Sequence, residues 1–201
     1  MTAVFWVLLA VYQAVAILDR RQPAENALGR RPRAQTVLLQ TPLFLTACWF
    51  AVDAGALGRS LVQPGYVLAG ALAGYAVHAV SLLVTNGVQH LRELLPALGG
   101  YFFRWRDRWN YFVENPVVMG MLAVNSIVEE ILYRAAAQPL LIEATGRPWA
   151  SILLVAILFS AAHQHFLRGP LLEGVEFLAY AVLLGALYYA TGSLVFVMVI
   201  H

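Results

Sequence analysis

The stretch Glu129-Glu130-Ile131-Leu132-Tyr133-Arg134 places three ionisable side chains inside a segment that is otherwise apolar. An Asp, Lys or Arg at the centre of a bilayer costs about 2.5–3.5 kcal/mol even on the lenient insertion scale. A membrane protein keeps such groups where they meet partners, line a wet cavity or take part in chemistry. We therefore expect other parts of the sequence to supply partners for these three groups.

The composition is typical of a helical membrane protein. Of the 201 residues, 61% are hydrophobic and only 12% are charged, whereas a soluble domain is about 25% charged. The net charge of +2 does not favour a nucleic-acid partner, and we expect none. Cys48 is the single cysteine, so the chain has no intrachain disulfide and no Cys/His spacing typical of a metal site.

Seven apolar runs divide the chain. They lie at residues 3–18, 36–52, 66–84, 116–138, 149–166, 174–190 and 193–201. A spanning helix needs about 20 residues, with a range of about 17–25. The first six runs qualify, and we expect the short seventh run to be the beginning of a truncated helix. The pattern predicts an all-α, polytopic membrane protein with about seven transmembrane helices.

The connection between the third and fourth runs has a different composition. Its arginines alternate with aromatic side chains, a mixture that fits an amphipathic helix lying in the interfacial layer. The aromatic residues are Tyr101, Phe102, Phe103, Trp105, Trp109, Tyr111 and Phe112. We place a boundary after it, with N-terminal helices and this interfacial segment in residues 1–115 and a catalytic core in residues 116–201.

Helical spacing divides the charges of the opening stretch. Residues four apart share a helix face, so Glu130 is placed to pair with Arg134. Glu129 is rotated by about 100° from Glu130 and lies one turn from Asn125. A carboxylate left without a cation in a low-dielectric setting is suited to act as a general base. The alternative is that both acids only hold helices together.

Two histidines in later apolar runs are candidate partners for Glu129. His163 follows Phe159 by four residues, so both are expected on one face of the fifth run. A lone histidine in an apolar helix is more often a packing residue, but the acid in the preceding run favours a functional role. His201 ends the seventh run and could converge with the other two groups. We interpret His165 as an interfacial residue without a catalytic role.

These residues resemble three motifs of a known family, the CAAX-processing and bacteriocin-processing (CPBP, ABI-type) intramembrane endopeptidases. Glu-Glu-x-x-x-Arg at 129–134 is similar to the first motif, and Phe-x-x-x-His at 159–163 to the second. Thr-Gly-Ser-Leu at 191–194, leading to His201, resembles the start of the third, His-x-x-x-Asn. Its closing asparagine would lie four positions after His201, beyond the sequence. The resemblance covers about residues 116–201.

The resemblance implies a glutamate-type protease that needs no cofactor. Glu129, aided by His163, would activate a water molecule for attack on a peptide carbonyl. His201 and the asparagine would stabilise the oxyanion, while Glu130 and Arg134 would support the site. The substrate would be a prenylated CAAX sequence, a leader peptide or a C-terminal sorting peptide, at a bacterial cell membrane.

Three other functions are compatible with the same residues. One glutamate and two histidines also form a zinc-hydrolase ligand set, although the sequence lacks His-Glu-x-x-His, and we expect no metal. A non-proteolytic immunity or scaffold protein could use the charged cluster to bind a partner. A proton-coupled transporter would also bury such charges, but it usually contains inverted repeats or broken helices, which the sequence does not show.

Overall fold

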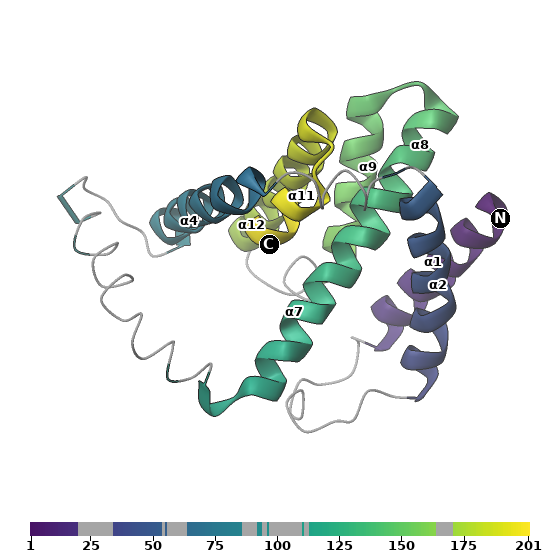
Figure 1. Cartoon of the computed structure of the whole chain (residues 1–201), viewed down its shortest axis with the longest axis horizontal. Coiled ribbons are helices and arrows are strands. Elements are labelled where there is room, and N and C mark those ends of the chain that lie inside the picture. The colour runs from purple at the N-terminus through teal and green to yellow at the C-terminus, as the bar shows by residue number, and fades with distance from the viewer. Residues whose placement is uncertain are drawn as a thin grey trace.

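The chain is built from helices, as Figure 1 shows for its computed structural model. The structure describes residues 1–19, 34–53, 64–85, 113–163 and 171–201, together with a few isolated positions between them. Within these ranges the elements are α1 (Thr2–Asp19), α2 (Ala34–Asp53), α4 (Gly65–Thr85), α7 (Pro116–Glu130), η1 (Ile131–Ala137), α8 (Gln138–Thr145), α9 (Pro148–Ala161), α11 (Leu171–Thr191) and α12 (Leu194–Ile200). No strand occurs in this part of the chain, which confirms the all-α prediction there.

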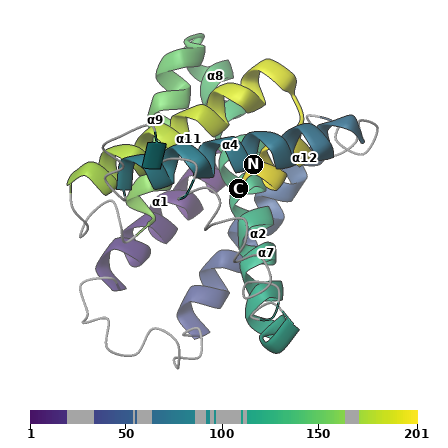
Figure 2. The same cartoon turned by 90° about the vertical axis from the view of Figure 1, so that its left-hand side faces the viewer.

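One long helical rod organises the others. It consists of α7, η1 and α8 and runs without interruption from Pro116 to Thr145. In Figure 1 this rod crosses the middle of the molecule, with α1 and α2 on one side and α4, α11 and α12 on the other. Figure 2 shows α4 alongside α11. Helices from both halves of the chain therefore pack on the segment that carries the charged stretch.

Six of the seven apolar runs each correspond to a helix, although the helix of the fifth run ends at Ala161, and the fourth run lies within the composite rod. Of the helices described, Leu171–Thr191 is long and apolar enough to cross a membrane, while Thr2–Val15, Gly65–Ser81 and Pro148–Ala161 are shorter apolar stretches. The count of seven transmembrane spans therefore stays a prediction. So does the division at residue 115, and the expected interfacial segment lies almost wholly outside the described residues.

Local sequence explains where the helices of the second half begin and end. Pro116 and Pro148 open α7 and α9, where a missing backbone N–H costs nothing. Gly146 closes α8 with a φ of 64°, a conformation that glycine adopts without strain. Gly192 separates α11 from α12 in the same way, with a φ of 65°. The Ser193 hydroxyl then caps α12 by accepting a hydrogen bond from the backbone N–H of Phe196.

The middle of the rod is a π-helix rather than an α-helix. It covers Ile131–Ala137, directly after the two glutamates, and all seven of its residues are buried. The backbone N–H of Gln138 donates to the carbonyl of Tyr133, five residues earlier, where an α-helix would use a residue four earlier. The wider turn changes which of the side chains that follow Glu130 share a helix face. Segments of this kind often occur at functional sites.

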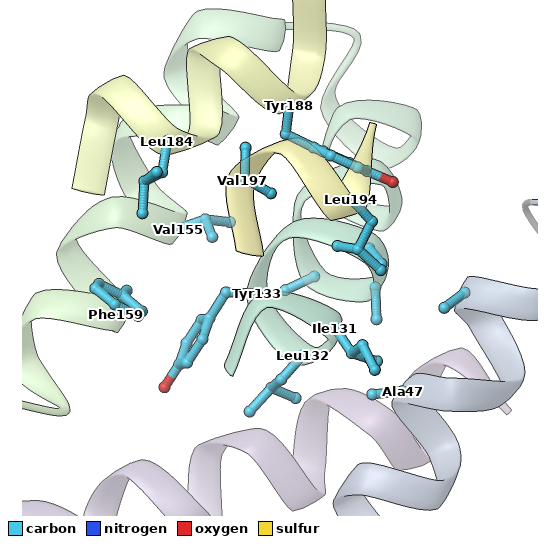
Figure 3. Packing of buried hydrophobic residues seen from close by; sticks show 14 of the residues in the cluster. Ala47, Ile131, Leu132, Tyr133, Val155, Phe159, Leu184, Tyr188, Leu194 and Val197 are labelled. Atoms are coloured by element: carbon cyan, nitrogen blue, oxygen red, sulfur yellow. The ribbon is translucent and has the colours of Figure 1, made fainter. Parts of the chain in front are cut away.

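The hydrophobic core lies around this π-helix. Figure 3 shows Ile131 and Leu132 directed toward α2 and α1, while Tyr133 lies near Phe159 of α9. The edge of one ring faces the other, with the Tyr133 and Phe159 centroids 5.3 Å apart. On the α1 side, the Gln13 amide donates to the Tyr133 hydroxyl at 2.7 Å and to a backbone carbonyl of α9 at 3.0 Å. These contacts fix α1 against the rod and α9.

Two glycines of α4 allow a close approach to α12. A Cβ added at Gly70 would lie 2.9 Å from the carbonyl oxygen of Phe196, and one at Gly74 would lie 3.1 Å from the Cα of Ile200. Small residues four apart are a common device for bringing helix backbones together in membrane proteins. Because α12 leads directly to His201, α4 helps to position that histidine.

We predict that Gly74→Val destabilises the protein, because the added side chain meets the α12 backbone rather than the end of a flexible side chain. Overpacking of this kind costs about 1–3 kcal/mol in the free energy of unfolding. Thermal unfolding of the detergent-solubilised protein would measure the loss. Gly65→Val is the control, because nothing lies within 4 Å of a Cβ at that position of the same helix. Equal unfolding temperatures for the two variants would contradict the role given to Gly74.

Candidate active site

The two adjacent glutamates occupy different environments at the end of α7. The Glu130 side chain is fully buried, whereas that of Glu129 is 13% exposed. Glu130 Oε2 lies 3.4 Å from Nε of Arg134, whose side chain is also fully buried. The structure thus contains the ion pair expected from the spacing. A buried pair of this kind balances two charges that would each be costly alone.

Arg134 is further held by an aromatic ring. Its guanidinium carbon lies 4.8 Å from the ring centroid of Phe159, which is a cation–π arrangement. None of its three guanidinium nitrogens donates a hydrogen bond to another described residue. Glu130 and the face of Phe159 are therefore the groups that balance the arginine charge.

His163 lies just beyond α9 rather than within it. The predicted helix continued to residue 166, but α9 ends at Ala161, and the backbone N–H of His163 donates to Ser160 in a turn. The sequence contains no glycine or proline there to predict that end. Nδ1 of His163 lies 2.8 Å from the carbonyl oxygen of Phe159. Because a carbonyl only accepts, we assign the proton to Nδ1, which leaves Nε2 directed toward the glutamates.

Glu129 lies between an amide and two imidazoles. Its Oε1 accepts a hydrogen bond of 2.8 Å from Nδ2 of Asn125, one turn earlier. Its Oε2 lies 3.5 Å from Nε2 of His163 and 3.7 Å from Nε2 of His201. These two distances are longer than a good hydrogen bond. The carboxylate is therefore fixed on one side by Asn125 and faces two ring nitrogens on the other.

His201 is held by the second glutamate. Its Nδ1 lies 2.8 Å from Oε1 of Glu130, and since that carboxylate is paired with Arg134, we assign the shared proton to His201. This contact directs the opposite ring nitrogen toward Glu129. Glu130 thus bridges Arg134 and His201, a role that spacing alone did not predict because it joins residues 71 positions apart.

Phe159 is the aromatic centre of the site. Its ring lies 4.5 Å from that of His163 and 5.8 Å from that of His201, centroid to centroid. Phe177 of α11 stacks on it at 5.6 Å with an interplanar angle of 9° and also contacts His163 at 4.7 Å. Tyr180, one turn later, lies 6.3 Å from His201. Sequence analysis missed Phe177 and Tyr180, whose only signal is their shared helix face in an otherwise generic apolar run.

The histidine side of the site borders a cavity between α4 and α11. Its volume is about 670 Å³, and His201 and Tyr180 belong to its wall. His165 falls outside the described residues. Within the described ranges, no group of three or more His, Cys, Asp or Glu side chains is arranged to hold a metal ion.

Comparison with protein families agrees with this arrangement. Residues 112–201 match the family described as type II CAAX prenyl endopeptidase Rce1-like. Residues 112–201 are therefore similar to that family. The matched residues contain the first two motifs and the start of the third, which confirms the resemblance to the CAAX-processing endopeptidases. No curated protein matches the chain, and no solved structure does. Rce1-like proteins are membrane-embedded proteases, so the family supports a hydrolase that acts on a peptide or protein at the membrane.

We predict that Arg134→Met alone destabilises the protein more than Arg134→Met combined with Glu130→Gln. The single change leaves a buried carboxylate without its cation, which costs about 3–5 kcal/mol in the free energy of unfolding. The double change removes that charge while keeping an oxygen for His201. Thermal unfolding of both variants in the same detergent would measure the difference. If the double variant unfolds at the lower temperature, the ion pair is not what stabilises this part of the site.

Proposed function

We propose that the protein is an intramembrane endopeptidase in which Glu129 and His163 activate a water molecule. The observation that supports this most is the position of Glu129 Oε2, which lies 3.5 Å and 3.7 Å from nitrogens of two imidazoles that follow the ends of separate helices, α9 and α12. Glu129, His163 and His201, one residue from each motif, therefore lie close together. A water molecule bound there would contact a carboxylate and an imidazole at once.

The reaction follows from these groups. Glu129 takes a proton from the water, which His163 Nε2 orients, and the water oxygen forms a bond to the carbonyl carbon of the substrate. The carbonyl electrons move to its oxygen. His201, which this proposal takes as protonated on both ring nitrogens, donates from Nε2–H to that oxyanion, while its Nδ1–H stays hydrogen-bonded to Glu130. When the tetrahedral intermediate collapses, the C–N bond breaks. The leaving amine receives the proton from Glu129.

The surrounding residues keep this geometry. Asn125 fixes one oxygen of Glu129, so the other faces the histidines. Arg134 pairs with Glu130, and this carboxylate in turn orients the ring of His201. Phe159 packs against both imidazole rings and against the guanidinium. We assign these four residues supporting roles rather than direct contact with the substrate.

The substrate in this proposal is a segment of a membrane-associated protein or peptide. The family description names the CAAX prenyl class, while a leader peptide or a C-terminal sorting peptide would present a similar scissile bond. The proposed setting is a multi-pass protein of a bacterial cell membrane, in agreement with the seven apolar runs. Cleavage would need no cofactor.

We predict that Glu129→Gln and His163→Ala each lower kcat by about 10²–10⁴-fold, the usual contribution of a positioned general base or its partner. The measurement uses the purified full-length protein in liposomes and a farnesylated CAAX peptide with a fluorophore and a quencher at its two ends. Leader and sorting peptides labelled in the same way extend the substrate panel. Glu143→Gln is the control, because Glu143 is an exposed acid on α8.

Two results would contradict the proposal. Wild-type cleavage rates for both variants would exclude Glu129 and His163 from catalysis. If both variants keep full biological activity, and neither they nor the wild type cleave any peptide of the panel, the immunity or scaffold role is favoured.

We predict that cleavage persists after metal removal, because the proposed water is activated by a carboxylate and an imidazole. Dialysis against a strong zinc chelator, followed by the same fluorescence assay and by metal analysis of the protein, checks this. Loss of activity that added Zn²⁺ restores would instead favour the zinc-hydrolase alternative.

A further inference from the structure

The cavity beside His201 has walls of two kinds. It lies between α4 and α11, which Figures 1 and 2 show side by side, and it has a volume of about 670 Å³. Most of its lining is apolar, with Val77 and Val80 from α4 and Leu183 from α11. A cavity of this size is comparable with the sites that hold small ligands or a few side chains of a peptide.

This cavity is continuous with the proposed site. His201 lines it, and so does Phe177, whose ring contacts the ring of His163 at 4.7 Å. Tyr180 also belongs to its wall and lies 6.3 Å from the His201 ring. A peptide segment in the cavity would thus lie next to the two histidines that face Glu129.

Two carboxylates give the cavity an acidic character. Glu173 is exposed and Glu176 is half-buried, and both line it from the first two turns of α11. Neither Arg nor Lys occurs among the described residues that line it. Attraction to the helix N-terminus is a sufficient reason for an acid at Glu173, in the first turn, but it falls off beyond that turn and does not explain Glu176. A cationic ligand group would complement both.

The distance from these acids to the site fits a peptide. Glu176 precedes Tyr180 by four residues, which is about 6 Å along a helix. An extended peptide advances about 3.3–3.6 Å per residue. A substrate residue two to four positions from the scissile bond would therefore bring a Lys or Arg head group near the carboxylates.

We infer that this cavity receives the substrate segment beside the scissile bond and selects a segment that combines apolar side chains with a Lys or Arg two to four residues from that bond. The apolar side chains lie between α4 and α11, and the basic group pairs with Glu173 and Glu176. This inference rests on the proposed protease activity, and it names the substrate class of that same site.

The test compares pairs of peptides that the full-length protein cleaves in liposomes. All are quenched-fluorescence versions of the best-cleaved peptide of the panel described above. The two members of a pair carry Lys or Gln at one position, and each position two to four residues from the mapped cut, on either side, has its own pair. At one or more of these positions, we expect the KM of the wild type to be about fivefold to tenfold lower for the Lys peptide than for the Gln peptide. Two partly exposed ion pairs would give a difference of this size. Glu173→Gln with Glu176→Gln removes this preference and leaves kcat for the Gln peptide unchanged.

A charge exchange tests direct pairing. Glu176→Arg should disfavour the Lys peptide and favour one with Glu at the same position. The control is Glu143→Arg, which makes the same chemical change at an exposed acid outside the cavity.

The outcomes separate this inference from the proposed function. If the wild type does not distinguish Lys from Gln, or if the double variant loses activity on both peptides equally, selection by Glu173 and Glu176 is excluded. If the wild type cleaves none of the peptides, the protease assignment itself fails, and if Glu129→Gln cleaves them at the wild-type rate, Glu129 is not the general base. A loss confined to Lys-containing peptides in the double variant supports the inference.

Discussion

The structure depends on one buried carboxylate, that of Glu130. It lies 3.4 Å from Arg134 and 2.8 Å from His201, so it joins α7, the π-helix and the end of α12. An isolated charge at such a position would be very unfavourable, and each of its partners would lose a counter-ion without it. Burial is tolerable because the arginine charge lies close to the carboxylate and His201 donates a hydrogen bond to it. The same constraint fixes the orientation of the His201 ring, which links stability to the geometry of the site.

Two neighbouring glutamates therefore have different environments although only one residue step separates them. Glu130 is turned into the core and is held by fixed partners, whereas Glu129 is turned toward the partly exposed side, where two imidazoles face it. Asn125 restrains Glu129 without supplying a charge. A carboxylate so placed can exchange a proton with water, while its neighbour maintains the electrostatic setting. This difference is the physical basis for assigning the chemistry to Glu129.

Aromatic packing connects this centre with its surroundings. The ring of Phe159 contacts the guanidinium, both imidazoles and Phe177, so a shift of α11 would be felt by the histidines. The same helix supplies the acids of the neighbouring cavity. In the proposed mechanism, recognition of a substrate segment and placement of the two histidines thus both depend on one face of α11.

The sequence alone determined the all-helical class, the positions of the seven apolar helices and the pair of Glu130 with Arg134, because hydrophobic runs and four-residue spacing are local properties. Its two complete motifs and the start of a third also indicated the family that residues 112–201 match. Tertiary structure alone decided that residues 131–137 form a π-helix, that α9 ends before His163, and that His201 pairs with Glu130. Tertiary structure alone also showed that α4 and α11 line a common cavity beside His201. Each of these features depends on contacts between segments far apart in the chain. A local sequence pattern does not predict which apolar helix faces pack against one another.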